Sequence, residues 1–159
     1  AENVMIVDLL RNDLSRIAET GTVKTPALFS IEPYQSLWQM TSTVTATLQA
    51  RTSFAEVLRA LFPCGSITGA PKHKTMQLIE QLESTPRGLY TGAIGWFGFN
   101  GESQFSIAIR TVIIECEEAH FHVGAGIVTD SIPEAEWQET WDKAAGIMLA
   151  AERSAQRPR

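Results

Sequence analysis

The chain has 159 residues, of which 44% are hydrophobic and 19% are charged, a balance typical of a water-soluble globular protein and not of a disordered or membrane-embedded one. Thirteen lysines and arginines against eighteen aspartates and glutamates give a formal net charge of -5, which argues against nucleic acid as a partner. Two cysteines are too few for a disulfide framework, and no apolar run approaches the roughly 20 residues that cross a bilayer, so we expect a cytoplasmic protein that does not bind membranes.

The first part of the chain is expected to contain a helix followed by a strand. Apolar residues at near-helical spacing predict a helix over residues 1–17, which Gly21 ends. Extended chain follows and is interrupted by Pro26 and Pro33. Strict alternation then predicts a strand over residues 37–48, with one face made mostly of threonines.

Two helices are expected in the middle of the chain. Ser53 followed by Glu56 is the pattern of a capping box, and it predicts a helix over residues 54–61 that a proline stops. A proline in the first turn suits a second helix over residues 71–82.

Residues 91–123 are rich in strand-forming residues. The runs WFGF and FSIAIRTVII flank Asn100 and Gly101, a strong hairpin signal because both residues tolerate positive φ. A further strand is expected over residues 119–123. Pro133 then opens a final helix, and five of its residues are expected to be buried: Trp137, Trp141, Ala144, Ala145 and Met148.

This order of elements predicts an α+β domain with a mainly antiparallel sheet and flanking helices. The domain is expected to cover residues 1–152, with a polar tail over residues 153–159.

The final helix carries the pattern with the most chemical information. Glu136, Glu139 and Lys143 recur at helical spacing and lie near one face, which by itself is most often a solvated stripe. The preceding glycine-rich run GAGIVTDS lets backbone N–H groups approach an anion. Two carboxylates beside an anion-accepting backbone suggest Mg²⁺ bridging protein and substrate carboxylates. Glu2 could supply a further ligand, although its spacing alone favours an exposed charge near the N-terminus.

Other single residues are open to two interpretations. Arg110 is expected in a strand, sharing a small-residue face with Ser106 and Ala108, where it either captures a ligand carboxylate or pairs with a surface acid. Tyr90 would ordinarily be a core tyrosine. The histidines are interpreted as surface residues.

The loop from Cys64 to Lys72 resembles an anion cradle that leads into a helix, and it could equally be a simple turn. It lacks the spacing of a nucleotide-binding P-loop.

Five segments in order resemble the chorismate-binding enzymes: ENVMIVDLLRNDLSRI, PCGSITGAPKHKTMQLIEQLE, RGLYTGAIGWFGF, FSIAIRT and GAGIVTDSIPEAEWQETWDKA. The resemblance implies the family's α/β sandwich built around antiparallel sheets, of which this chain would be the C-terminal part. Within the family, GSITGAPK and STVTATL are most similar to the aminodeoxychorismate synthases, followed by the anthranilate synthases.

The resemblance also implies a role for each candidate residue. Mg²⁺ would be held by Glu2 and Glu139 with Glu136 close by, and it would bind the ring carboxylate of chorismate. The residues implied in holding the substrate are Tyr90, Arg110, Gly124, Gly126, Lys143, Ser66 and Thr68.

The reaction implied is amination of chorismate to 4-amino-4-deoxychorismate, on the route to p-aminobenzoate and folate, with ammonia from a separate glutamine amidotransferase. Gln39 stands where many members have a histidine, and the lysine proposed as nucleophile in this branch would lie upstream of the chain. We therefore expect a folded but catalytically silent fragment, prone to self-association through exposed edges. The alternatives are 2-amination by an anthranilate synthase and a fragment without any catalytic role.

Overall fold

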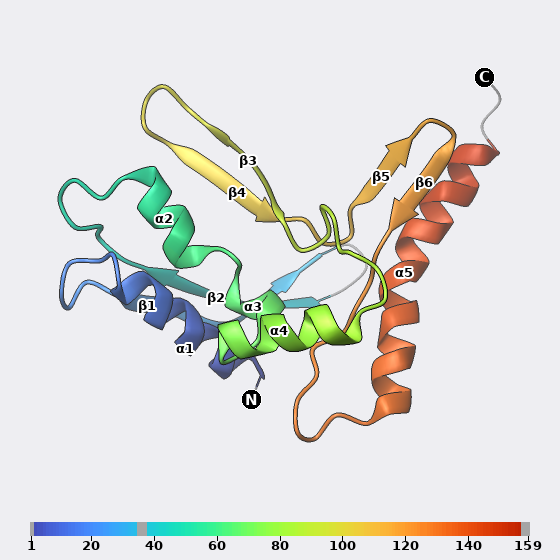
Figure 1. Cartoon of the computed structure of the whole chain (residues 1–159), viewed down its shortest axis with the longest axis horizontal. Helices are drawn as coiled ribbons and strands as arrows, with labels where there is room; N and C mark the ends of the chain where they lie inside the picture. The colour runs from blue at the N-terminus through green and yellow to red at the C-terminus, as the bar shows by residue number, and fades with distance from the viewer. Residues whose placement is uncertain (1, 35–37, 157–159) are drawn as a thin grey trace. The chain divides into compact units, whose positions relative to one another are not determined.

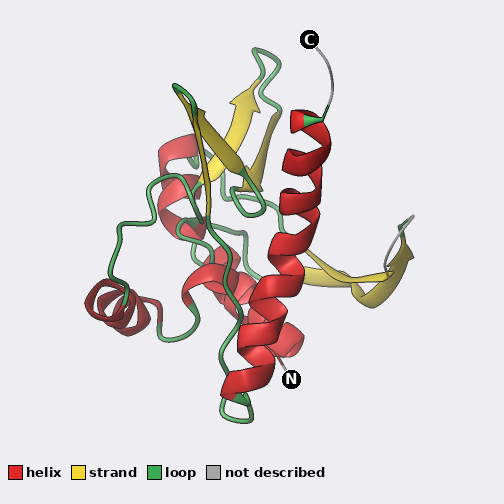
Figure 2. Ribbon diagram, turned by 90° about the vertical axis from the view of Figure 1, so that its right-hand side faces the viewer, coloured by secondary structure: helices red, strands yellow, loops and turns green. Residues whose placement is uncertain are grey.

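The computed structural model describes residues 2–34 and 38–156. The described chain divides into two compact units, residues 1–84 and residues 85–159. Three separate two-stranded antiparallel ladders make up its sheets, β1–β2, β3–β4 and β5–β6 (Figure 2). None of the helices in the described residues is both long enough and apolar enough to cross a membrane.

The first unit combines one strand pair with four helices (Figure 1). Helix α1 spans Glu2–Ser15 and packs against β2, α2 and α3. Strands β1 (Lys24–Pro33) and β2 (Trp38–Thr45) pair antiparallel. Helices α2, α3 and α4 span Phe54–Leu61, Gly65–Thr68 and Lys72–Leu82.

Strand β1 forms in a segment that was expected to be merely extended and interrupted by prolines. The ladder with β2 shifts register on both sides of Ala27, and Pro26 lies in the first of these irregularities. Phe29 has φ of 56° in the second, and its N–H donates to Ser42 Oγ over 3.1 Å. A proline is compatible with a strand at such a bulge, because no ladder N–H is required there. Leu37, where the expected second strand begins, lies outside the described residues.

The helices expected in the middle of the chain are confirmed. Ser53 Oγ accepts from the backbone N–H of Glu56, and the Glu56 carboxylate accepts from the backbone N–H of Ser53. Hydrogen bonds from the hydroxyl and then the backbone N–H of Ser53, with a smaller contribution from Arg59, lower the pKa of Glu56 below its ordinary value of 4.5. Helix α4 begins one residue later than expected, with Pro71 as its N-cap.

A buried ion pair joins the two longer helices of this unit. Asp13 of α1 is 5% exposed, and its Oδ2 lies 2.6 Å from Lys72 Nζ at the start of α4. An unpaired carboxylate at this depth would lower the free energy of unfolding, so we expect the loss of either partner to destabilise the unit.

The second unit holds two hairpins and the last helix. Strands β3 (Ala93–Phe97) and β4 (Ser103–Ile107) pair in register, and the connection contains Gly101 with φ of 85°, so the hairpin expected at this position is confirmed. Gly95 lies against β4 so closely that a Cβ would be 2.1 Å from the Gln104 carbonyl oxygen. Strands β5 (Val112–Glu115) and β6 (Glu118–Phe121) form the second hairpin.

Helix α5 spans Pro133–Ala155 and therefore continues three residues into the segment expected to be a tail. The expected burial of its apolar side is largely wrong: Ala144 is 5% exposed, whereas Trp137 is 65% and Trp141 is 51% exposed. Ala145 and Met148 are exposed as well. Two-stranded ladders offer little apolar surface, so the second unit does not cover every side of a helix of 23 residues.

Candidate functional site

Lys143 links the last helix to the glycine-rich loop that precedes it. Its Nζ donates to the carbonyl oxygen of Gly124 over 3.0 Å and lies 2.5 Å from Oε1 of Glu139, one turn earlier on α5. The Lys143 side chain is 29% exposed, so the ammonium is partly shielded from water but still accessible. The structure thus places a cation, a carboxylate and the loop backbone side by side.

Tyr90 reaches the same loop from the segment before β3. A Cβ built on Gly124 would lie 2.9 Å from the Tyr90 hydroxyl oxygen, so the phenol occupies the space that any larger residue would need. The Tyr90 ring stacks on the His122 imidazole, with centroids 5.3 Å apart and planes inclined by 20°. The guanidinium of Arg87 lies 5.6 Å from the same ring centroid. We call Tyr90, His122, Gly124, Glu139 and Lys143 the tyrosine cluster.

Glu136 lies one turn before Glu139 and lines a different part of the loop. Its Oε2 is buried without a hydrogen-bond partner among the described residues. It borders a mainly apolar hollow between the loop and the start of α5, together with Ala125, Ile127, Val128, Ser131, Pro133, Trp137 and Thr140. Trp137 and Trp141 form an edge-to-face pair with centroids 5.9 Å apart.

A buried carboxylate oxygen without a donor suits a cation, and oxygen ligands are those that Mg²⁺ prefers. Within either unit, however, the described residues contain no group of three acidic, histidine or cysteine side chains that could hold a metal ion. The expected set joins Glu136 and Glu139 of the second unit with Glu2 of the first, and it stays a prediction.

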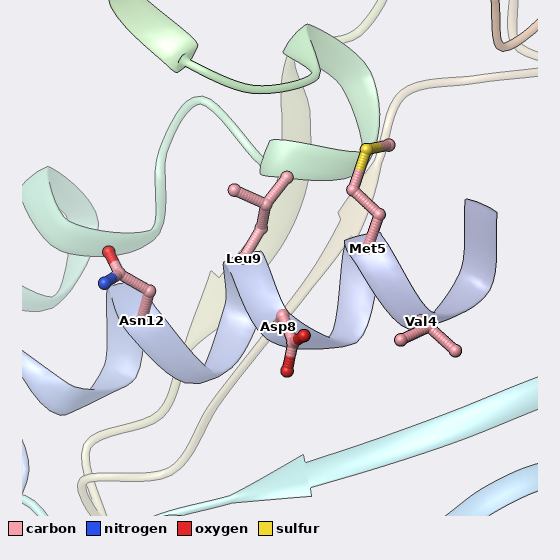
Figure 3. Close-up of a pocket in the computed structure, with 5 residues that line it drawn as sticks. All are labelled: Val4, Met5, Asp8, Leu9 and Asn12. Atoms are coloured by element: carbon pink, nitrogen blue, oxygen red, sulfur yellow. The ribbon is translucent and has the colours of Figure 1, made fainter. Parts of the chain in front are cut away.

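The start of α1, where Glu2 lies exposed, leads into a hollow on the same helix. Figure 3 shows Met5 and Leu9 reaching toward α3, where a Cβ on Gly65 would lie 3.0 Å from Leu9 Cβ. The hollow is lined by Val4, Met5, Asp8, Leu9 and Asn12. This close approach of Gly65 fixes the loop Cys64–Lys72 on α1.

Ser66 and Thr68 lie in the short helix α3, in the loop that was interpreted as an anion cradle or a turn. The Ser66 hydroxyl lies 3.1 Å from Cys64 Sγ, and the Thr68 hydroxyl donates to the carbonyl oxygens of Cys64 and Gly69. In this structure both hydroxyls are therefore engaged with their own loop. Their role toward a substrate stays a prediction.

The expectation that Arg110 lies within a strand is wrong. Strand β4 ends at Ile107, and Arg110 lies in an exposed bend with φ of 50° before β5 begins. The Ile109 N–H donates to the Ile107 carbonyl, and this local turn ends the ladder just beyond Ala108. Arg110 is thus free of the alternation that was expected to orient it. Gly126 is exposed in the loop before α5, and its role toward a substrate stays a prediction.

Sequence reasoning missed two residues beside Tyr90. His122 was interpreted as a surface histidine, but it is half-buried and stacked on Tyr90, whereas His120 is exposed and pairs with Glu118. Arg87 was not considered. The available signal in the sequence was its place three residues before Tyr90. The structure closes a turn there through the hydrogen bond from Tyr90 N–H to Arg87 O.

Comparison with known proteins shows to which family the chain belongs. Residues 1–149 match the family model described as chorismate binding enzyme. Aminodeoxychorismate synthase component 1 of Bacillus subtilis (strain 168) is 46% identical over 154 residues, which are 97% of this chain and 33% of the relative. Anthranilate synthase component 1 of Aquifex aeolicus (strain VF5) is 43% identical over 152 residues, which are 96% of this chain and 31% of the relative.

The fold agrees with this match. The crystal structure of anthranilate synthase component I from Streptococcus pneumoniae TIGR4 superposes with a TM-score of 0.81 at 41% identity, covering 89% of this chain and 32% of that chain. The expected α+β class is confirmed by this likeness and by the helices and antiparallel strand pairs described above. The chain spans about a third of the length of the curated relatives it matches. The chain therefore belongs to the chorismate binding enzyme family.

Proposed function

We propose that the tyrosine cluster binds one carboxylate of chorismate, and that the reaction served is its amination to 4-amino-4-deoxychorismate. The observation that carries this proposal is the association of Tyr90, Gly124 and Lys143 in a chain of this family. An ammonium has three donors. Lys143 uses two of them on Gly124 and Glu139, which leaves one for a ligand oxygen beside the Tyr90 hydroxyl.

Arg110 is proposed as a second donor to the substrate. A guanidinium can bind a carboxylate through two parallel N–H groups, and this orients the ligand as well as holding it. The exposed bend gives the side chain room to reach a ligand. Arg110 would bind the same carboxylate as the tyrosine cluster, and with the other carboxylate on the metal described next the ring would be fixed for attack at a single carbon.

Mg²⁺ is proposed as the cofactor, held by Glu136 and Glu139 with Glu2. The buried, unpartnered Oε2 of Glu136 supports this assignment. When bound, the ion would act as a Lewis acid on the second carboxylate of the substrate. Lys143 would then balance the charge of Glu139 and hold the loop at Gly124.

A second protein is proposed as the source of ammonia. Both relatives described above are named component 1 of their synthases. On that ground we propose a partner amidotransferase that releases ammonia from glutamine. Both proteins would act in the cytoplasm.

Amination at the 2-position, giving anthranilate, is the second candidate. Relatives named anthranilate synthase component 1 are 43–44% identical to the chain, against 46–48% for relatives named aminodeoxychorismate synthase component 1, so identity favours neither strongly. Gln39, at the position where the resemblance expects a histidine in many members, is exposed on β2.

The test has two parts and uses the 159-residue chain itself. Titration calorimetry with chorismate, with and without Mg²⁺, should show binding that the metal strengthens and that Glu139→Gln weakens. Absence of binding under both conditions would refute the proposal. Incubation with chorismate, Mg²⁺ and excess ammonium should yield no product, because the chain spans only about a third of the length of its relatives. Any product would overturn that expectation, and mass spectrometry with fluorescence would identify it as aminodeoxychorismate or anthranilate.

A further inference from the structure

His122 differs from an ordinary surface histidine in its burial and in its contact with an aromatic ring. It directly follows β6, is half-buried, and presents its imidazole face to the ring of Tyr90 at a centroid distance of 5.3 Å. His120, two residues earlier and within β6, is exposed, and its Nε2 lies 3.3 Å from Glu118 Oε2. The two histidines therefore have different surroundings although they are only two residues apart.

Tyr90 is a residue whose orientation matters. Its hydroxyl is at the end of a side chain with two rotatable bonds, and a small rotation would carry the oxygen away from Gly124. The ring is half-buried, so packing does not enclose it on every side. Two contacts restrain it, the stack on His122 and the guanidinium of Arg87 at 5.6 Å.

We propose that His122 is a positioning residue for Tyr90. By stacking on the phenol ring, the imidazole holds the Tyr90 hydroxyl against Gly124, whose carbonyl oxygen accepts from Lys143, so that a ligand carboxylate at Gly124 would accept from both donors. His122 acts through the ring and needs no contact with the ligand. This role rests on the proposed function, because it matters for binding only if the tyrosine cluster holds a carboxylate.

His122 contacts Tyr90 through the face of its ring, so another flat aromatic ring at this position should hold Tyr90 equally well. His122→Phe keeps the stack and removes the ring nitrogens, whereas His122→Ala removes the stack altogether. His120→Ala is the matched control, because it deletes an imidazole from the same hairpin without touching Tyr90.

Calorimetric titration of the 159-residue chain with chorismate and Mg²⁺ tests the proposal. His122→Ala should raise the Kd about three- to tenfold, the usual strength of an aromatic pair. His122→Phe should stay within about twofold, and His120→Ala should be unchanged. In a Tyr90→Phe background, His122→Ala should have no further effect, because the hydroxyl that it positions is gone. An equal loss in both backgrounds, or a loss in His122→Phe as large as in His122→Ala, would overturn the proposal.

A second measurement separates this inference from the proposed function. The chain contains two tyrosines, Tyr34 and Tyr90, so selective labelling gives two sets of ring signals in the NMR spectrum. His122→Ala should shift the Tyr90 ring signals and leave those of Tyr34 in place, while His120→Ala should move neither. If the chain binds no chorismate, the proposed function fails. Tyr90 signals that are unchanged in His122→Ala would refute the positioning role whether or not chorismate binds.

Discussion

Replacement of Gly124 by alanine is the sharpest test of the tyrosine cluster. The added Cβ would lie 2.9 Å from the Tyr90 hydroxyl oxygen, about 0.5 Å inside ordinary van der Waals contact. The phenol must rotate or the loop must move, and overpacking of this kind costs about 1 kcal/mol where the obstructing atom ends a side chain. A displaced hydroxyl also loses its bond to the ligand, so we expect the Kd for chorismate to rise about tenfold.

The assay pairs urea unfolding with calorimetric titration. Gly146→Ala is the control, because nothing lies within 4 Å of a Cβ at this position in α5. It should stabilise the chain by about 0.5–1 kcal/mol, since alanine is the better helix former. In a Tyr90→Phe background, Gly124→Ala should cost less than about 0.5 kcal/mol, because the obstructing oxygen is absent. A cost that is the same with and without the hydroxyl would show that the contact with Tyr90 is not what requires a glycine.

Three further predictions concern other parts of the molecule. Asp13→Asn should lower the free energy of unfolding by about 2 kcal/mol because it leaves a partly buried lysine unpaired, whereas Asp8→Asn, in an exposed pair, should cost less than about 0.5 kcal/mol; equal urea midpoints would contradict this. Ser53 lowers the folded-state pKa of Glu56, so the native chain should be more stable than Glu56→Gln at pH 7, and this difference should shrink as the pH falls below 4.5. A thermal-unfolding difference that grows as the pH falls would be inconsistent with that sign. Arg110→Lys should raise the Kd for chorismate about threefold or more, because lysine keeps the charge but lacks the two parallel N–H groups of the guanidinium. An unchanged Kd in calorimetric titration would remove Arg110 from the site.

The elements predicted correctly are those whose signals are local. Ser53 and Glu56 specify the start of α2 through bonds between neighbours, and the glycine at the β3–β4 turn supplies a positive φ that few other residues adopt. The break before β5 and the turn after it have no such signal, since Arg110 and Cys116 adopt positive φ without being glycine or asparagine. Strand β1 was missed because Pro26 suggests an interruption, and only the bulged ladder shows how it is accommodated.

The candidate site was likewise predicted only in part from the sequence. The family motifs implied that Tyr90, Gly124 and Lys143 act together, and the structure places both Tyr90 and Lys143 against Gly124. His122 escaped notice because its partner is 32 residues away in sequence, and nothing in the alternation of the strand expected over residues 119–123 distinguishes it from His120. Contacts between distant segments of this kind depend on how the loop folds back, which periodicity does not describe.

The paired indoles on α5 give the chain a built-in optical reporter. Trp137 and Trp141 meet edge to face at 5.9 Å, and indoles this close share their electronic transitions, so their joint circular dichroism depends on the helix keeping both rings in place. Trp137 and Glu136 line the same hollow, which places an emitting ring beside a proposed ligand of the metal. Fraying of the helix start and entry of a cation should therefore alter two different optical signals, and both can be followed without attaching any dye.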